Sequence, residues 1–341
     1  MTDPLLNVEE LSIAFRQRRG ELTVVRDVSF DVGVGEVVGL VGESGSGKSV
    51  SCRSILRLMP AHGVMRARAI EFLGRDVTKL SDRELRDHRR HNVGMVFQDP
   101  YSCLNPTQRV GEQVAEALRV NAGMSKIDAR ARTIELFESV GIDRGAERQR
   151  SYPHELSGGM RQRVMIAIAI SAGPKLLIGD EPTTALDVTT QAQILALMSR
   201  LRDDTGMAVL LVSHDFGVVA QVCDRVVVMY GGRVMESGPV TQVCTEPQHP
   251  YTRALLESIP RLEAAGRRVR REGIPGQPPN PADVGEGCPF ADRCAHASAR
   301  CSSVDMSLRP VGPSHVTACP FVGEWSDPPG ATESSRVGGP S

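Results

Sequence analysis

The run LVGESGSGKSV at residues 40–50 limits the fold of this chain more than any other stretch. It places three glycines, three serines and one lysine directly behind the apolar run EVVGL. Gly42, Gly47, Lys48 and Ser49 satisfy the pattern G-x-x-x-x-G-K-[ST] between a predicted strand and a predicted helix. Glycines allow successive backbone N–H groups to turn towards a phosphate. The alternative is a Gly/Ser-rich loop that merely contains a lysine, but agreement at every position of the pattern favours a phosphate-binding loop.

Each part of this phosphate loop, residues 42–49, has an expected partner on a nucleotide. The helix that follows adds the positive end of its dipole. Lys48 supplies a point charge for the outer phosphates, and the Ser49 hydroxyl is the expected Mg²⁺ ligand. The predicted nucleotide contacts in this region are Gly42, Ser44, Gly45, Ser46, Gly47, Lys48, Ser49 and Val50.

Composition excludes several classes of protein. The 341 residues are 40% hydrophobic and 24% charged, which is ordinary for a globular protein with a real core. The formal net charge is −1, so there is no global basic field that would attract nucleic acid. The longest apolar run, VMIAIAI at 164–170, is too short to span a bilayer, and the N-terminus lacks the pattern of a secretory signal. We therefore expect a cytoplasmic protein that reaches a membrane only through a partner.

The apolar pattern predicts an α/β protein with a parallel sheet. Alternating and β-branched residues over 5–45 indicate short strands, and a helix should begin at Lys48 and end before Pro60. KLLIGDE and MAVLLVSHD are apolar runs typical of buried parallel strands. The segment between them should be a crossover helix ended by Gly206. Residues 102–172 should be mostly helical.

Two carboxylates follow the strand LLIG. Asp180 at the strand end is predicted to hold Mg²⁺, and Glu181 to orient or deprotonate an attacking water. A solvated acidic turn is the alternative, but adjacent carboxylates at a buried strand end repel one another unless a cation is near. His214 follows another buried strand and could contact a γ-phosphate. Gln98 begins a loop after VGMVF and could touch Mg²⁺.

The stretch ELSGGMRQR decides the family. Ser157, Gly158 and Gly159 offer a second phosphate-compatible helix start, which makes sense if it serves a nucleotide held by another subunit. With GESGSGKS, Gln98, LLIGDEPTTALD and SHD in this order, the chain resembles the ATP-binding subunit of an ABC transporter from about residue 5 to 260. The resemblance implies an α/β fold with a P-loop (RecA-like) core, an antiparallel β subdomain and a helical signature subdomain at about 102–172.

The same resemblance implies an ATP hydrolase that works as a head-to-tail dimer. Each ATP would lie between the phosphate loop of one chain and Ser157–Gly159 of the other, with Mg²⁺ held by Ser49, Gln98 and Asp180. Glu181 would be the general base and His214 the switch histidine. Phe15 would stack on adenine. Ala185–Asp187 would lie across the dimer seam.

Further stretches resemble the oligopeptide and dipeptide importer branch of this family, among them QDPYSCLNP and QHPYTRALLESIPRL. The branch implies a second ATP-binding subunit, more often in a heterodimer than a homodimer. It also implies two transmembrane permease subunits, an extracytoplasmic substrate-binding protein and a peripheral position on the cytoplasmic face of the membrane. The groove for the permease would lie in the helical region after Gln98. Nickel import remains an alternative to peptide import.

Four of the eight cysteines gather near the C-terminus with the spacing C-x5-C-x6-C-x17-C. This spacing matches neither a zinc finger nor a ferredoxin, so by itself it predicts only a four-thiolate site or four unligated thiols. The importer branch favours a [4Fe–4S] cluster over zinc. The expected ligands are Cys288, Cys294, Cys301 and Cys319.

The expected domains are an ATP-binding domain at 1–258, a C-terminal region with the cysteines at 259–325 and a disordered tail at 326–341. Two other functions are alternatives. A soluble ABC ATPase acting on DNA or ribosomes would need a long coiled-coil insertion or two ATP cores in one chain, and the sequence has neither. A regulatory iron–sulfur sensor with a secondary ATPase remains an alternative.

Overall fold

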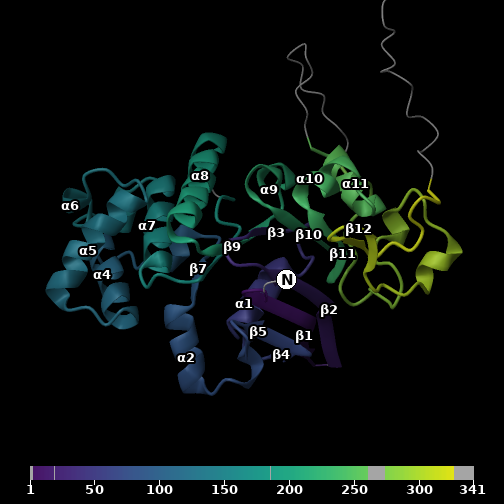
Figure 1. Ribbon diagram of the computed structural model, residues 1–341, viewed down its shortest axis with the longest axis horizontal. Helices are drawn as coiled ribbons and strands as arrows, with labels where there is room; N and C mark the ends of the chain where they lie inside the picture. Colours follow the sequence, from purple (N-terminus) through teal and green to yellow (C-terminus); the bar gives the residue numbers. More distant parts are fainter. Residues whose placement is uncertain (1–2, 19, 185, 260–272, 326–341) are drawn as a thin grey trace, which may run out of the picture.

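The computed structural model describes residues 3–18, 20–184, 186–259 and 273–325. Two sheets organise these residues, a larger mixed sheet and a smaller antiparallel one that lies beside it (Figure 1). Three expectations fall wholly or partly outside the described residues: Ala185 at the predicted dimer seam, residues 260–272 of the predicted C-terminal region, and the tail at 326–341. No helix among the described residues is long and apolar enough to cross a membrane.

The centre of the larger sheet consists of parallel strands in the order β10-β3-β9-β8-β7. Their bounds are β3 (Val37–Val41), β7 (Val93–Val96), β8 (Leu176–Asp180), β9 (Ala208–Ser213) and β10 (Arg225–Tyr230). Alternate residues pack into different hydrophobic clusters, Leu177 and Val209 into one and Ile178 and Leu210 into the other. Burial on both faces explains the continuous apolar runs, and it confirms the prediction of buried parallel strands.

The carboxyl ends of parallel strands meet at one edge of the sheet, where α/β proteins place their sites. The phosphate loop and α1 (Lys48–Ile55) follow β3, and Gln98 comes shortly after β7. Glu181 follows β8 directly, and His214 follows β9. The crossover helix α8 (Val188–Thr205) ends at Gly206 in the left-handed conformation, as predicted.

The antiparallel sheet has the order β2-β1-β5-β6, with β4 also paired to β1. Its strands are β1 (Leu6–Gln17), β2 (Gly20–Val32), β4 (Gly63–Arg66), β5 (Ala69–Phe72) and β6 (Arg75–Asp76). Helix α2 (Asp82–His91) follows, with a capping box formed by Ser81 and Glu84. The sequence indicated strands for the first part of this sheet but gave no prediction for α2.

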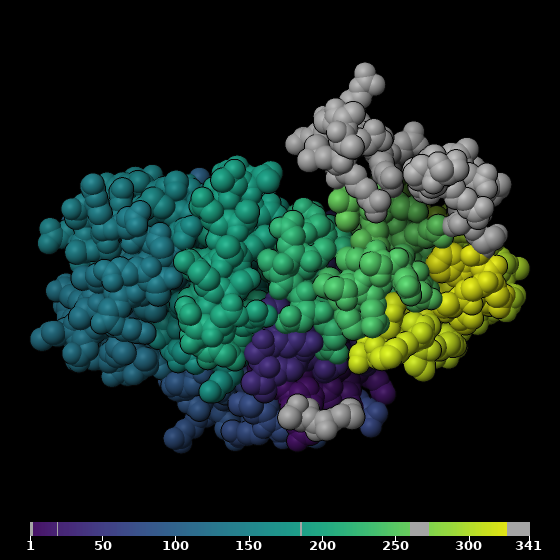
Figure 2. All heavy atoms as spheres, turned by 45° about the horizontal axis from the view of Figure 1, so that its top comes forward, coloured from purple at the N-terminus to yellow at the C-terminus, as the bar shows by residue number. Residues whose placement is uncertain are grey.

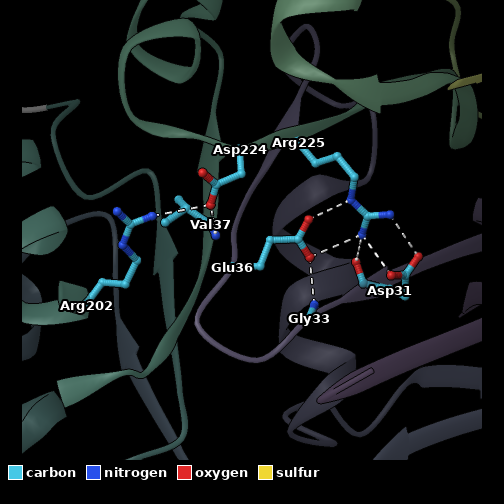
Figure 3. Close-up of polar contacts among 7 residues, drawn as sticks. All are labelled: Asp31, Gly33, Glu36, Val37, Arg202, Asp224 and Arg225. Atoms are coloured by element: carbon cyan, nitrogen blue, oxygen red, sulfur yellow. Dashed lines mark hydrogen bonds and ion pairs between the residues drawn. The ribbon is translucent and has the colours of Figure 1, made fainter. Parts of the chain in front are cut away.

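Charged side chains join the two sheets at the amino end of β3 (Figure 3). The Arg225 guanidinium donates to Asp31 at 2.9 Å and lies 2.8 Å from a Glu36 carboxylate oxygen. Asp224 accepts a 2.8 Å hydrogen bond from the Val37 backbone N–H. These contacts lie at the end of β3 opposite the phosphate loop, so they fix the strand without occupying the site edge.

The helices of residues 100–170 gather at one end of the molecule (Figure 1), and the C-terminal segment, residues 273–325, lies towards the other end, as the colours of Figure 2 show. The helical end contains α3 (Pro100–Cys103), α4 (Val110–Asn121), α5 (Lys126–Ser139), α6 (Gly145–Arg148) and α7 (Gly158–Ile170). This agrees with the helical character predicted for 102–172. Between the ends, α9 (Phe216–Val222) precedes β10.

The C-terminal segment extends the larger sheet. Strand β11 (Arg233–Pro239) pairs with β10 and with β13 (His315–Thr317), and β13 pairs with β12 (Arg309–Gly312), all antiparallel. Helices α10 (Val240–Thr245) and α11 (Pro250–Glu257) lie between β11 and this segment in the sequence. The Glu236 carboxylate, fully buried, accepts from the His249 backbone N–H and lies 2.8 Å from His315 Nε2. A buried, fully hydrogen-bonded carboxylate thus joins the C-terminal segment to the core.

Candidate functional site

The phosphate loop requires glycine at two positions for steric reasons. A Cβ on Gly42, whose φ is 149°, would lie 2.0 Å from the Met229 carbonyl oxygen. A Cβ on Gly47, whose φ is 95°, would lie 2.8 Å from Val25 Cγ2. Gly47 is also the N-cap of α1, and no side chain accepts a hydrogen bond from the first N–H groups of that helix. The loop therefore presents free backbone donors at a helix start, which is the arrangement that binds phosphate.

Lys48 lies folded over the loop. Its ammonium group donates to the carbonyl oxygens of Gly42 at 2.7 Å and Glu43 at 2.8 Å. Burial lowers the pKa of Lys48 from its usual value, and the nearby carboxylates of Glu181 and Asp180 partly offset that effect. The loop carbonyls thus hold the ammonium group, and the carboxylates of Glu181 and Asp180 are near enough to affect its pKa. The contact of Lys48 with phosphate stays a prediction.

Asp180 is buried at the end of β8. Its Oδ2 accepts a hydrogen bond from Arg53 at 3.1 Å. Its Oδ1 is also buried and has no hydrogen-bond partner in the described structure. An orphaned buried carboxylate oxygen costs free energy unless a cation or donor satisfies it. This oxygen fits the metal-holding role predicted for Asp180.

Glu181 is the meeting point of three polar side chains. Its Oε2 accepts hydrogen bonds from Gln98 Nε2 at 3.0 Å and Thr184 Oγ1 at 2.9 Å, and it lies 3.3 Å from His214 Nδ1. The φ of Glu181 is 50°, in the left-handed region that non-glycine residues rarely adopt. Such strain recurs at functional sites because the surrounding contacts enforce it. Sequence reasoning missed Thr184, although its spacing of three from Glu181 places it within one turn.

A cavity of about 520 Å³ brings these groups together. Its lining residues are Phe15, Val24, Ser44, Gly45, Gly47, Lys48, Ser49, Val50, Gln98, Glu181 and His214. Ten of these eleven were predicted from the sequence, and Val24 was not. Gly42, Ser46 and Asp180 do not line the cavity; Ser46 and Asp180 are buried. Phe15 lies at the cavity wall, with its ring centroid 5.4 Å from that of His62.

The signature stretch lies elsewhere. Ser157 is the N-cap of α7, where its hydroxyl accepts from the Met160 backbone N–H. A Cβ on Gly159 would lie 2.6 Å from Thr190 Cγ2, so glycine permits close packing of α7 against α8. Ser157, Gly158 and Gly159 are absent from the described lining of the nucleotide-sized cavity. In this structure the signature stretch therefore lies outside that cavity.

The four C-terminal cysteines line a different cavity, of about 310 Å³. Burial raises the pKa of the Cys288 thiol to about 12 and also raises the pKa values of Cys294 and Cys319. Among the residues described, no three His, Cys, Asp or Glu side chains are grouped closely enough to hold a metal ion. The structure therefore supports neither the expected [4Fe–4S] ligand set nor its zinc alternative, although it brings Cys288, Cys294, Cys301 and Cys319 to one cavity.

Two family models match this chain. Residues 25–184 match the ABC transporter model, and residues 235–301 match the model of the oligopeptide/dipeptide transporter C-terminal region. The first covers the phosphate loop, the signature stretch and Asp180–Glu181. The second covers most of β11, both following helices and three of the four clustered cysteines.

Relatives match over most of the chain. The oligopeptide transport ATP-binding protein OppD of Escherichia coli is 45% identical over 317 residues, covering 93% of each chain. A putative peptide import ATP-binding protein of Brucella ovis is 46% identical over 326 residues, covering 93% of this chain and 96% of its own length.

Solved structures match about 70% of this chain. CbiO1 of Clostridium perfringens, part of the ABC transporter complex cbiONQ, superposes with a TM-score of 0.61 at 29% identity, over 72% of this chain and 92% of its own. A dimeric ATP-binding cassette in a post-hydrolysis state bound to ADP and Pi has the same TM-score at 28% identity, over 69% of this chain and 98% of its own.

Proposed function

We propose that this chain, because it belongs to the ABC transporter ATP-binding proteins, hydrolyses ATP to drive the uptake of di- and oligopeptides through a membrane permease. The observation that carries the hydrolytic part is the position of Glu181, whose carboxylate faces the phosphate-loop cavity beside Gln98 and His214. The choice of peptides is supported by the peptide-import names of relatives that are 45–46% identical over 93% of the chain.

The residues divide the chemistry of phosphoryl transfer among them. The loop N–H groups and Lys48 hold the β- and γ-phosphates. Glu181 accepts a proton from water as the water oxygen bonds to the γ-phosphorus and the bond to the β-γ bridging oxygen breaks, giving ADP and phosphate. Gln98 and His214 orient the carboxylate and the γ-phosphate. All five groups lie at one edge of the sheet.

The side-chain oxygen atoms at this site fit a Mg²⁺ ion. Oδ1 of Asp180 is buried without a partner, and Ser49 and Gln98 both line the cavity. Hydroxyl, amide and carboxylate oxygens are the ligands that this hard cation prefers. When bound, Mg²⁺ would neutralise charge on the phosphates.

The second half of the ATP site would come from another subunit. Ser157–Gly159 form a helix start that the cavity of the same chain does not reach, so a head-to-tail pair would supply each cavity with the partner's signature stretch. By its resemblance to the peptide-importer branch, we place this chain in a heterodimer with a second ATP-binding subunit. Two permease subunits and an extracytoplasmic binding protein complete the transporter, and this chain lies on the cytoplasmic face of the membrane.

The permease groove would lie in the helical end. A surface cavity of about 490 Å³ there is lined by residues of α4 and α5, including Glu112, Glu116, Arg119, Lys126 and Arg130. Both signs of charge in one groove suit a cytoplasmic helix with polar residues of both signs.

Uptake in cells tests the proposal. Cells lacking this chain should lose uptake of labelled peptides, and the native chain should restore it, whereas Glu181→Gln should not. Glu71→Gln, the same change on an exposed residue of β5, is the matched control and should restore uptake. If cells lacking the chain take up peptides normally but lose nickel uptake, the transported substrate is nickel and not peptides. ATP turnover that depends on the cysteines but on no permease would favour the sensor function.

A separate proposal concerns the C-terminal domain predicted at residues 259–325 and the four cysteines that it contains. Four thiols line one cavity of about 310 Å³, and the resemblance to the importer branch implies a metal centre held by them. In this structure no three of the described side chains are grouped closely enough to hold a metal ion, so the proposal rests on that resemblance and on the shared cavity. Purified protein should contain iron and acid-labile sulfide if the centre is [4Fe–4S], or zinc without sulfide. Cys301→Ser should lower the metal content, whereas Cys103→Ser, an exposed cysteine outside the cavity, should not. Metal-free protein from cells supplied with iron and zinc would end the proposal.

A further inference from the structure

One side chain of the phosphate loop points away from the cavity. Ser44 and Gly45 line that cavity, but Glu43 is absent from its described lining. The Glu43 carboxylate is paired instead with the guanidinium of Arg293, 250 residues later in the chain. One of the two hydrogen bonds, from Arg293 Nη2 to Glu43 Oε1, measures 3.1 Å. Arg293 immediately precedes Cys294, so the pair joins the cysteine segment to the loop.

Arg293 is held rigidly. Its side chain is only 6% exposed, compared with 25% for Glu43. It donates further hydrogen bonds to Tyr230 Oη at 2.9 Å and to the carbonyl oxygens of Pro275 at 2.7 Å and Ile274 at 3.0 Å. The hydrogen bond to Glu43 is the main cause that raises the pKa of Arg293 above its usual value. Its planar fork serves four acceptors at once, which a lysine could not do.

A second contact holds the same loop residue. The Glu43 backbone N–H donates to the Tyr251 hydroxyl at 2.9 Å. Tyr251 packs against Tyr230 and Phe290, with ring centroids 4.5 and 5.2 Å away. The main chain and the side chain of Glu43 are therefore both fixed by residues beyond 229.

A carboxylate in a phosphate loop disfavours phosphate binding, because both groups are negatively charged. Unpaired, it would repel the phosphates of ATP across a partly desolvated site. We propose that Arg293 is a positioning residue of the ATP site, which neutralises Glu43 and holds its carboxylate outside the cavity, so that the C-terminal cysteine segment sets the affinity of the phosphate loop for nucleotide. This inference rests on the proposed ATP-binding function and adds to it a residue outside the nucleotide cavity.

ATP affinity of the full-length chain tests this inference. Arg293→Met should weaken ATP binding about tenfold. This loss is smaller than the one expected on breaking a fully buried ion pair, because Glu43 is partly exposed. Glu43→Gln should change it by no more than about twofold, since the repulsive charge is removed together with the pair. The double variant should bind like Glu43→Gln alone. Such suppression would not occur if Arg293→Met merely weakened the fold.

Two further readouts distinguish positioning from general damage. In the assembled ATPase, Arg293→Met should raise KM for ATP while leaving kcat within about twofold, and added salt should narrow the KM difference by screening Glu43. Arg293→Lys should give an intermediate affinity. Arg309→Met is the matched control, because the hydrogen bonds that the Arg309 side chain makes to described residues go to Asp305 and Ser307 of its own segment.

The outcomes are distinguishable from those that test the function itself. Absence of ATP binding by the native chain would refute the proposed function. Normal ATP binding by the native chain with equal affinity in Arg293→Met would refute only the role of Arg293. A double variant as weak as Arg293→Met would also refute it, since Glu43 would then not carry the effect.

Discussion

Two helix starts in this chain share a glycine-rich sequence but differ in geometry. At α1 the N-cap is Gly47 in the left-handed conformation, and no side chain caps the helix. At α7 the N-cap is Ser157 in an extended conformation, and its hydroxyl already accepts the Met160 N–H. The first borders a cavity with Lys48 and Ser49, whereas the second borders α8.

The difference shows how one motif type can serve two purposes. The start of α1 has free donors, a lysine and nearby carboxylates, so it can bind nucleotide within a single chain. The start of α7 has an exposed end but no charged group of the cavity beside it. In the proposed head-to-tail pair, it completes a site when another subunit presents a nucleotide to it. Changes at α1 should therefore alter ATP binding by one chain, and changes at α7 should act only in the dimer.

The largest effect is expected at Glu181, which belongs to neither helix start. Glu181→Gln should lower ATP hydrolysis about 10²–10⁴-fold, because an amide cannot accept the proton from water. ATP binding should persist, since neither helix start is changed. Phosphate release by the assembled ATPase and ATP affinity measured on the same sample check both halves. Turnover within about tenfold of native would show that another group is the base.

Lys48→Met should weaken ATP binding by the single chain about 10–100-fold, the usual loss for a charge-assisted hydrogen bond. This is the direct test of the α1 half of the comparison, and fluorescence of a labelled ATP analogue would measure it. Lys175→Met removes an exposed lysine just before β8 and should leave affinity unchanged. Native affinity in Lys48→Met would mean that the α1 helix start is not the main nucleotide site.

The sequence predicted which groups meet at one edge of the sheet because these groups come soon after the strands. Gln98, Glu181 and His214 come after apolar runs typical of buried strands, and parallel strands align their carboxyl ends. Thr184 escaped notice because a threonine has no chemistry that marks it before its neighbour is known.

The parts that could not be predicted depend on long-range packing. No pattern links Glu43 to Arg293 across 250 residues, because an exposed ion pair and a partly buried one look alike in a sequence. Strands β12 and β13 are too short for a recognisable alternation, so their addition to the larger sheet was also missed.

Glycine-to-alanine substitutions compare the steric limits on the backbone at the two helix starts. Gly42→Ala should destabilise the protein by about 1–3 kcal/mol or prevent folding, since the new Cβ meets the Met229 carbonyl at a positive φ. Gly45→Ala is the control, because its Cβ has no atom within 4 Å and only the strain of its φ of 82° remains. Gly159→Ala should cost less than Gly42→Ala, because the atom it meets is a side-chain methyl of Thr190. Thermal unfolding measures all three, and equal losses would contradict this order.

The smallest effect tests the α7 half. Ser157→Ala removes the N-cap and should lower the free energy of unfolding by about 1 kcal/mol, while ATP affinity of the single chain stays native. ATP-induced pairing of subunits, followed by size-exclusion chromatography in the Glu181→Gln background, should weaken, because the frayed helix start presents fewer ordered donors to the partner's nucleotide. Ser157→Thr keeps an accepting hydroxyl and should restore pairing. If Ser157→Ala weakened ATP binding by an isolated chain, α7 would belong to the same site as α1, and the division between the two helix starts would be wrong.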